Sequence, residues 1–210
     1  LLDELTPVAG LSYLKAMNFT KLDPEDERLP VALGGFTIGV SPLEMAAGFA
    51  TLQNDGCYRE PTCIIKIEDT QGNLIYLSEN EEEEKKNADK DQAQGTRIYK
   101  SNAARMMTDM LQTVFTEGTA RGLGLGDMPC AGKTGTTNDN KDGWFAGYTR
   151  YYTTSIWVGY DQPETLPGLN GSTYPGHIWQ NYMLSIHENT TPMSFIPYIE
   201  QKGVDQDFAE

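Results

Sequence analysis

Apolar residues recur at helical spacing in several stretches of this chain. They return every three to four positions over 7–19, 41–56, 101–118 and 178–186. Such spacing gathers them on one face of a helix, so each stretch is predicted to be an amphipathic α-helix. Residues 1–5 have a similar pattern without a preceding cap, as in a chain cut through a helix.

The most strongly marked of these helices begins at Ser41. The run Ser41-Pro42-Leu43-Glu44 combines a favoured N-cap serine, a proline at the first helical position and a glutamate able to bond back to the cap's amide. Gly56 supplies the left-handed residue that commonly ends a helix. We expect the buried face to carry Leu43, Ala46, Ala47 and Ala50.

Runs rich in β-branched and aromatic residues predict strands in two places. Residues 62–77 have such runs on both sides of a polar turn and predict a hairpin. Residues 130–136, 142–148 and 152–160 are joined by short connections, and they predict an antiparallel meander with 130–136 at one side. The chain is therefore predicted to be α+β, with a mostly antiparallel sheet flanked by helices.

The pattern also predicts which side chains are buried. Trp144, Phe145 and Tyr148 are large aromatic residues of the predicted meander, and we expect them in the core. We expect the same of the methionine-rich stripe in the 101–118 helix, which comprises Ala103, Met106, Met107, Met110, Leu111 and Val114. The charged, proline-bounded stretch 21–30 is expected to be a surface loop.

Charge limits the classes of function and marks one segment. The 210 residues include 30 acidic and 16 basic side chains, a formal net charge of −14, which repels phosphate backbones and argues against a nucleic-acid partner. Residues 79–91 hold seven acids and three lysines and predict a solvated loop with no function of its own. We divide the chain into a domain over 1–190, interrupted by a flexible acidic insertion at 79–95, and a C-terminal tail over 191–210.

Cysteine usage predicts no metal site. Cys57, Cys63 and Cys130 lack the paired C-x-x-C spacing of zinc sites, and neither a metal nor a cofactor is predicted. Cys57 and Cys63 could form a disulfide in an oxidising compartment, or both could be unpaired buried thiols. No apolar run reaches the roughly 18 residues that a membrane-spanning helix needs.

Candidate chemistry is concentrated in Lys133-Thr134-Gly135-Thr136, in the first strand of the predicted meander. Lys133 offers an ammonium that can hold a substrate carboxylate and assist proton transfer, and the threonines offer hydroxyls. Gly135 has no side chain, so an extended peptide could lie beside this strand as an added strand. Thr119 and Arg121 lie in the preceding loop. Each could face the same cleft, or could have only a structural role within the loop.

Several motifs together resemble a known family. They are KTGTTN at 133–138, DGWFAGY at 142–148 and WVGYD at 157–161, preceded by ALGG at 32–35, VSPLEMA at 40–46 and GTA at 118–120. In this order they closely resemble the transpeptidase domain of class A penicillin-binding proteins. The similarity covers most of 29–188, interrupted by the acidic insertion.

The resemblance implies a β-lactamase/transpeptidase-like fold and acyl transfer. In that family a serine attacks the D-Ala-D-Ala bond of a peptidoglycan stem peptide, an amine of a neighbouring stem resolves the acyl-enzyme, and β-lactams trap the serine. Lys133 and Thr136 would then be catalytic, and Thr134, Gly135 and Thr136 would bind substrate. The Thr136 hydroxyl is the expected partner of the substrate's terminal carboxylate, and the Thr136 N–H would supply half of the oxyanion hole.

The nucleophile of this family is expected on polypeptide that precedes the chain. Ser12-Tyr13-Leu14-Lys15 and Ser78-Glu79-Asn80 spell Ser-x-x-Lys and Ser-x-Asn, but we reject both. Ala16 stands where the family usually has proline, and the second triplet opens the acidic loop, which could not hold a catalytic group in place. We therefore expect the C-terminal part of a transpeptidase domain, inactive alone and partnered by the rest of the same protein.

The resemblance also implies a location and partners. The protein would be a bifunctional glycosyltransferase and transpeptidase at the extracytoplasmic face of the bacterial membrane, anchored by an N-terminal segment, and it would bind stem peptides and β-lactams. The alternatives are a D-Ala-D-Ala carboxypeptidase or a serine β-lactamase, which share Lys-Thr-Gly but are not expected to share the 32–35 and 40–44 motifs. A non-catalytic penicillin sensor or a structural pseudoenzyme is the alternative of another class.

Overall fold

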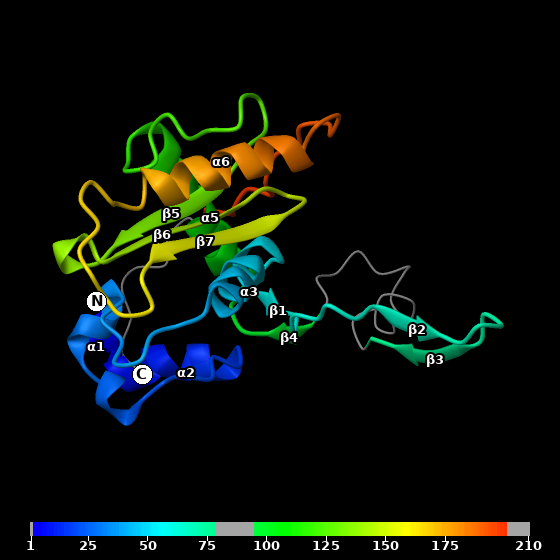
Figure 1. The fold of residues 1–210 in the computed structure, drawn as a ribbon, viewed down its shortest axis with the longest axis horizontal. Coiled ribbons are helices and arrows are strands. Elements are labelled where there is room, and N and C mark those ends of the chain that lie inside the picture. The colour runs from blue at the N-terminus through cyan, green and yellow to red at the C-terminus, as the bar shows by residue number, and fades with distance from the viewer. Residues whose placement is uncertain (1, 79–94, 201–210) are drawn as a thin grey trace.

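The computed structural model describes residues 2–78 and 95–200. Figure 1 shows a sheet between helices and a β-hairpin that projects from the rest. The predicted acidic loop 79–91 lies outside the described residues, and so does 201–210. Every described strand pair is antiparallel, which confirms the predicted α+β class.

The central sheet is the predicted meander. Its strands are β5 (Ala131–Thr136), β6 (Asp142–Tyr148) and β7 (Thr153–Gly159), in the order β5-β6-β7. A single turn of 3-10 helix, η3 (Asn138–Asn140), joins β5 to β6. Because β6 lies between its neighbours, β5 is an edge strand among the strands described here, as predicted.

One face of this sheet is covered by α6 (Tyr174–Ile186), drawn in orange in Figure 1. Trp179 of this helix is fully buried and packs on Phe145, with ring centroids 4.8 Å apart. Burial of such aromatic surface is a large favourable contribution to folding. The predicted 178–186 helix is therefore present, but it begins earlier because Pro175 is well suited to its first turn.

The opposite face is covered by α3 (Pro42–Gln53) and α5 (Ser101–Thr116). The buried Tyr148 of the sheet forms an apolar cluster there with Leu111 of α5, and Phe49 of α3 packs against it. The predictions that Phe145 and Tyr148 lie in the core are thus confirmed, whereas Trp144 is only half-buried.

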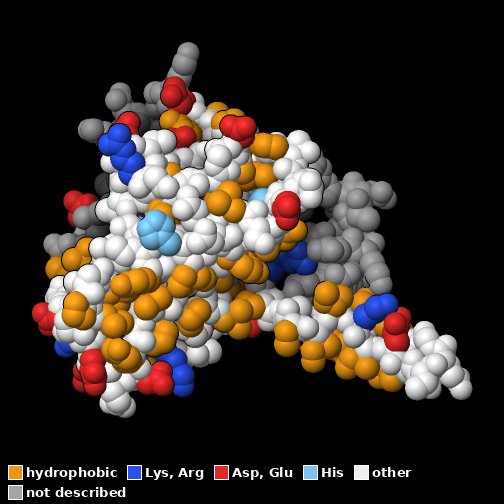
Figure 2. Space-filling model, turned by 45° about the horizontal axis from the view of Figure 1, so that its top comes forward, with side chains coloured by type: hydrophobic (Ala, Val, Ile, Leu, Met, Phe, Trp, Pro, Cys, Tyr) orange, Lys and Arg blue, Asp and Glu red, His pale blue; other side chains and the backbone are white. Residues whose placement is uncertain are grey.

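The remaining elements are short. They are α1 (Leu2–Leu5), α2 (Pro7–Ala16), η1 (Pro24–Asp26), η2 (Leu29–Leu33), and the strand pairs β1 (Cys57–Tyr58) with β4 (Thr96–Arg97) and β2 (Lys66–Glu68) with β3 (Leu74–Leu77). The β2–β3 pair confirms the predicted 62–77 hairpin. It projects from the body, and Figure 2 shows hydrophobic side chains along it; Ile65 and Ile75 are 57% and 68% exposed.

The predicted capping of α3 is confirmed. Ser41 Oγ accepts a hydrogen bond from the Glu44 amide, and the Glu44 carboxylate accepts one from the Ser41 amide at 2.8 Å. The same carboxylate accepts the amide of Thr20 at 2.6 Å and its hydroxyl at 2.9 Å. Partial burial raises the pKa of Glu44, but these hydrogen bonds outweigh burial and lower it to about 2. Gly56 has φ of 88°, as predicted for the end of this helix.

The prediction of a buried methionine stripe is wrong. Met106, Met107 and Met110 of α5 are 46%, 41% and 54% exposed. The face of α5 that is buried carries Ala104, Thr108, Leu111 and Phe115. Leu111 belongs to both sets and is buried as predicted. The buried face also carries Ala104 and Thr108, whose small side chains let the helix approach the sheet closely.

Three other side chains differ from prediction. Leu43 is 63% exposed because it lies in the first turn of α3, outside the helix face that meets the sheet. Cys63 is exposed, and like Cys57 and Cys130 it is a free thiol, so the two cysteines 57 and 63 are neither bridged nor both buried. Asp26, in the predicted surface loop, is fully buried, and its carboxylate accepts a hydrogen bond from the Thr37 amide at 2.6 Å, which offsets the cost of burying it.

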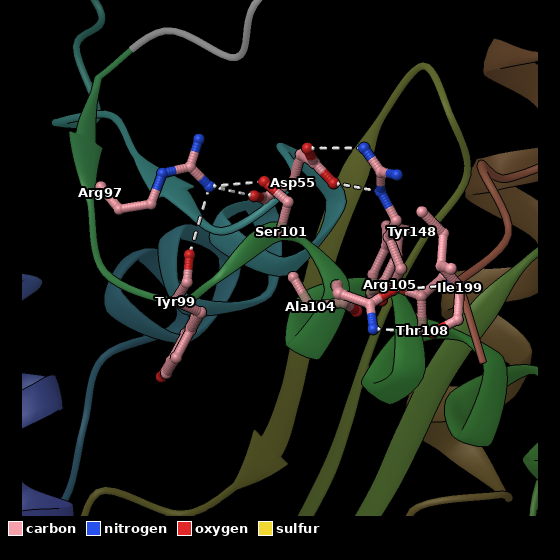
Figure 3. Close-up of polar contacts among 10 residues, drawn as sticks. Asp55, Arg97, Tyr99, Ser101, Ala104, Arg105, Thr108, Tyr148 and Ile199 are labelled. Carbon is pink, nitrogen blue, oxygen red and sulfur yellow. Dashed lines mark hydrogen bonds and ion pairs between the residues drawn. The ribbon is translucent and has the colours of Figure 1, made fainter. Parts of the chain in front are cut away.

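A polar junction ties the end of α3 to the start of α5 (Figure 3). The Asp55 carboxylate accepts two hydrogen bonds from the Arg105 guanidinium, at 2.7 and 3.0 Å. Burial raises the pKa of Asp55, but hydrogen bonds from Arg105 and Ser101 outweigh burial and lower it. One helical turn further on, the Thr108 hydroxyl lies 2.8 Å from the Tyr148 hydroxyl, which connects α5 to β6.

Candidate active site

The backbone of β5 presents hydrogen-bonding groups at the edge of the sheet where no other strand of residues 2–78 and 95–200 pairs with it, the open edge of β5. The Thr137 amide donates to the carbonyl of Asp142, its opposite residue, at 3.0 Å, so this is a hydrogen-bonded pair. Such pairs alternate with non-bonded pairs along an antiparallel ladder. Counting back along β5, the N–H and C=O groups of Thr136 and Thr134 point away from β6, toward the edge.

Lys133 brings its ammonium to the same edge. Its Nζ donates to the carbonyl of Thr134 at 2.8 Å and lies 3.3 Å from the Thr134 hydroxyl. The side chain is exposed and lies beside the outward-facing groups of the strand. An ammonium in this position can hold an anion or stabilise negative charge that develops nearby.

Thr134 is joined by a residue from the loop that follows α5. The hydroxyls of Thr119 and Thr134 lie 2.6 Å apart, so one donates to the other. Of the two loop residues that the sequence left open, Thr119 is thus brought to the candidate site. Arg121 is exposed two residues further along the same loop.

Thr136 is held from the α6 side of the sheet. Its hydroxyl accepts a hydrogen bond from the amide of Gly171 at 3.0 Å. Gly171 lies so close to the sheet that an added Cβ would be 2.8 Å from the nitrogen and 2.7 Å from the oxygen of Gly135. Sequence reasoning missed Gly171 because 35 residues separate it from Thr136 and no local pattern marks the contact.

The turn that ends β5 is fixed by Asp142. Its amide donates to the Thr137 hydroxyl at 2.8 Å, and its carboxylate accepts the Trp157 indole N–H at 2.9 Å. The first bond closes the turn between β5 and β6, and the second ties it to β7. The end of β5 is therefore held by β6 directly and, through the Asp142 carboxylate, by β7.

The two rejected motifs lie elsewhere. Ser12 is on α2, where its hydroxyl donates to the Ala9 carbonyl at 2.7 Å, and Lys15 lies 4.0 Å from the Glu27 carboxylate. Ser78 is buried, whereas residues 79 and 80 are outside the described part of the chain. Within that part, no cluster of His, Cys, Asp and Glu could hold a metal ion. None of its helices has the length and apolar character needed to cross a membrane.

A comparison with known families decides what kind of domain this is. The model described as "Penicillin binding protein transpeptidase domain" matches residues 23–183, which include all of β5, β6 and β7. The chain belongs to this family. The resemblance inferred from the sequence motifs is thereby confirmed.

Curated relatives agree with this assignment. The chain is 38% identical to penicillin-binding protein 1F of Bacillus subtilis over 195 residues, which cover 89% of the chain and 25% of the relative. It is 36% identical to penicillin-binding protein 1A of Pseudomonas aeruginosa over 218 residues, which cover 83% of the chain and 26% of the relative. The chain thus spans about a quarter of the length of these relatives.

Solved structures confirm the predicted transpeptidase-like fold. The penicillin-binding protein PonA1 from Mycobacterium tuberculosis superposes with a TM-score of 0.75 at 24% identity. The alignment covers 97% of this chain and 57% of the PonA1 chain. At this identity the likeness concerns the fold alone.

Proposed function

We propose that the protein containing this chain is a D-Ala-D-Ala transpeptidase that crosslinks peptidoglycan stem peptides through a serine acyl-enzyme. The open edge of β5 is the observation that carries the proposal. Along this edge lie the Lys133 ammonium, the paired hydroxyls of Thr119 and Thr134, and the outward N–H of Thr136. These groups suit a substrate that is an anionic, extended peptide.

In the proposed reaction a serine hydroxyl attacks the carbonyl carbon between the two D-alanines. The peptide C–N bond breaks, the departing D-alanine takes up the proton, and the stem peptide remains as an ester on the serine. An amine of a second stem peptide then attacks the ester, which forms the crosslink, and the serine oxygen regains a proton. A β-lactam forms the same kind of ester when its amide bond opens.

Each residue of the edge has a role in this scheme. The Thr136 N–H donates to the carbonyl oxygen as it gains negative charge, a contribution of about 2.7 to 4 kcal/mol in other acyl-transfer enzymes. The hydroxyls of Thr134 and Thr136 donate to the terminal carboxylate, and Lys133 holds that carboxylate and assists proton transfer near the serine. Gly135 leaves room for the extended peptide beside the strand.

The nucleophilic serine would lie on a preceding stretch of the same protein, so residues 1–210 alone would be inactive. The similarity to penicillin-binding proteins 1F and 1A supports this, because the chain corresponds to only about a quarter of their length. We further propose that the whole protein also carries a glycosyltransferase domain and an N-terminal anchor, and acts at the extracytoplasmic face of the bacterial membrane.

Labelled penicillin tests the proposal. We expect the full-length protein to form a covalent adduct that survives denaturation, and the chain of residues 1–210 to form none. Lys133→Ala in the full-length protein should slow acylation at least about tenfold because the ammonium is lost from the edge. Lys66→Ala, which removes a lysine of the projecting hairpin, is the matched control and should leave acylation unchanged.

The outcomes separate the alternatives. The absence of any adduct on the full-length protein would overturn the enzyme assignment. An adduct without crosslinking of stem peptides would favour a penicillin sensor. Cleavage of the terminal D-alanine to water alone would favour a carboxypeptidase, and rapid turnover of the penicillin a β-lactamase.

A further inference from the structure

We propose that Gly171 is a positioning residue for acyl transfer, acting through Thr136. It lies in the loop 166–173, between β7 and α6, and approaches β5 from the face that α6 covers. This inference rests on the proposed function, because it assigns Gly171 a part in that reaction. The residue touches neither the open edge nor the substrate, so its effect is transmitted by the strand.

The first observation is the hydrogen bond from the Gly171 amide to the Thr136 hydroxyl, at 3.0 Å. A threonine hydroxyl has one proton to donate and two lone pairs to accept with. Because the amide can only donate, the Thr136 oxygen is the acceptor in this contact. Its own proton is thereby left to donate elsewhere, which is the orientation that a substrate carboxylate requires.

The second observation is the close packing of Gly171 on the backbone. An added Cβ would be 2.5 Å from the Trp144 carbonyl oxygen, as well as 2.7 and 2.8 Å from the oxygen and nitrogen of Gly135. These are all backbone atoms of the β5–β6 ladder, so they cannot turn aside as a side chain could. Any larger residue at 171 must therefore displace the loop or the strand.

The third observation is that the loop itself is braced. The Leu166 amide donates to the Asn140 carbonyl at 3.0 Å, which ties the loop to the turn after β5. The Asn170 side chain accepts the Ser172 amide at 3.1 Å and its hydroxyl at 2.6 Å. Leu169 is fully buried. Because the loop is fixed by these contacts, it can hold Gly171 in a constant position against β5.

Together these contacts fix the residue that serves twice in the proposed reaction. The hydroxyl of Thr136 would bind the carboxylate, and its N–H would bind the oxyanion. Catalytic donors lose much of their effect when they are displaced by a fraction of an ångström. Loss of the contacts made by Gly171 would therefore lower the acylation rate.

The test compares two glycine-to-alanine variants of the full-length protein. Gly171→Ala should lower the rate constant of acylation by labelled penicillin at least about tenfold, because the strand carrying Thr136 shifts. Gly124→Ala is the matched control, since its φ is not positive and no atom lies within 4 Å of its added Cβ. Thermal melting of each variant shows whether it is folded.

A double-mutant cycle keeps the test decisive if Gly171→Ala is poorly folded. Thr136→Val removes the accepting hydroxyl with little change of shape, and Thr136→Ser retains it. If Gly171 acts through that hydroxyl, Gly171→Ala should slow acylation much less in the Thr136→Val background than in the wild type or in the Thr136→Ser background. Equal losses in all three backgrounds would show that the effect does not pass through the Thr136 hydroxyl, and would overturn the role assigned to the Gly171–Thr136 hydrogen bond.

The two proposals fail in different ways. If the wild-type protein forms no penicillin adduct, the proposed function fails. If the wild type is acylated and Gly171→Ala reacts as fast as Gly124→Ala, only the positioning role of Gly171 fails.

Discussion

At the scale of single residues, one carboxylate holds two segments in place at the start of α3. Glu44 accepts hydrogen bonds from both Ser41 and Thr20, so it caps its own helix and also fixes the chain that follows α2. Local sequence predicted the first role, since Ser41 and Glu44 have the spacing of a capping box. The second role depends on a residue 24 positions away and was not predictable from spacing.

The Glu44 carboxyl should make stability depend on pH. Its folded pKa of about 2 lies below its ordinary value of 4.5, so its contribution is fully present above pH 4.5 and is lost as the pH falls through about 2. Glu44→Gln should lower the free energy of unfolding by about 1 kcal/mol at neutral pH. Urea titrations of the full-length protein at several pH values measure this difference.

The low-pH measurements separate this account from simple loss of packing. The difference between wild type and Glu44→Gln should shrink toward pH 2, because the wild-type carboxyl is then being protonated as well. Glu164→Gln, at an exposed position, should show no such difference at any pH. A constant gap between wild type and Glu44→Gln down to pH 2 would contradict the assigned pKa.

At the scale of elements, α5 shows what spacing can and cannot predict. The repeat of apolar residues correctly predicted a helix, and the β-rich runs correctly predicted the β5–β7 meander. The rotation of α5 about its axis was mispredicted because methionine is a typical core residue and threonine is not. Met106 and Met110 were therefore expected in the core and Thr108 was not. Only the packed structure shows Thr108 bonding to Tyr148 and the methionines exposed.

The same limit applies to the candidate site. Lys133, Thr134 and Thr136 were predictable because they stand together in one motif, within a strand predicted to lie at an edge. The contributions of Thr119 and Gly171 come from separate loops, and their contacts form only when those loops pack on β5. Sequence therefore predicted the strand that carries the candidate residues better than the loop residues that contact it.

The ion pair between α3 and α5 should be important for stability. Side chains of Asp55 and Arg105 are 23% and 24% exposed, so removing one partner leaves a largely buried charge unpaired. Arg105→Ala should lower the free energy of unfolding of the full-length protein by about 1 to 3 kcal/mol, measured by chemical denaturation. The double variant with Asp55→Ala should cost less than the sum of the two single variants. Strict additivity would mean that the pair contributes no coupling.

At the scale of the whole molecule, stability should be uneven. The β2–β3 hairpin projects from the body, and its strands have exposed residues along nearly their whole length. A two-stranded hairpin of this kind is only marginally stable, whereas β6 is bonded on both sides and covered by helices on both faces.

Hydrogen exchange should report this difference directly. In the full-length protein we expect the amides of Ile67 and Tyr76 in the hairpin to exchange orders of magnitude faster than those of Phe145 and Ala146. Mass spectrometry with peptide-level resolution can measure this. Similar protection in both regions would show that the hairpin is covered by another part of the protein.

The open edge of β5, proposed to bind substrate, could also promote aggregation. Unpaired N–H and C=O groups on an edge strand are a template for aggregation, because a second copy of the strand can add to them as readily as a peptide substrate can. Proteins often guard such edges with lysine. Lys133 lies at this edge with its ammonium on the Thr134 carbonyl. We therefore expect Lys133, the residue proposed to serve the reaction, also to hinder pairing of β5 with the same strand of a second copy.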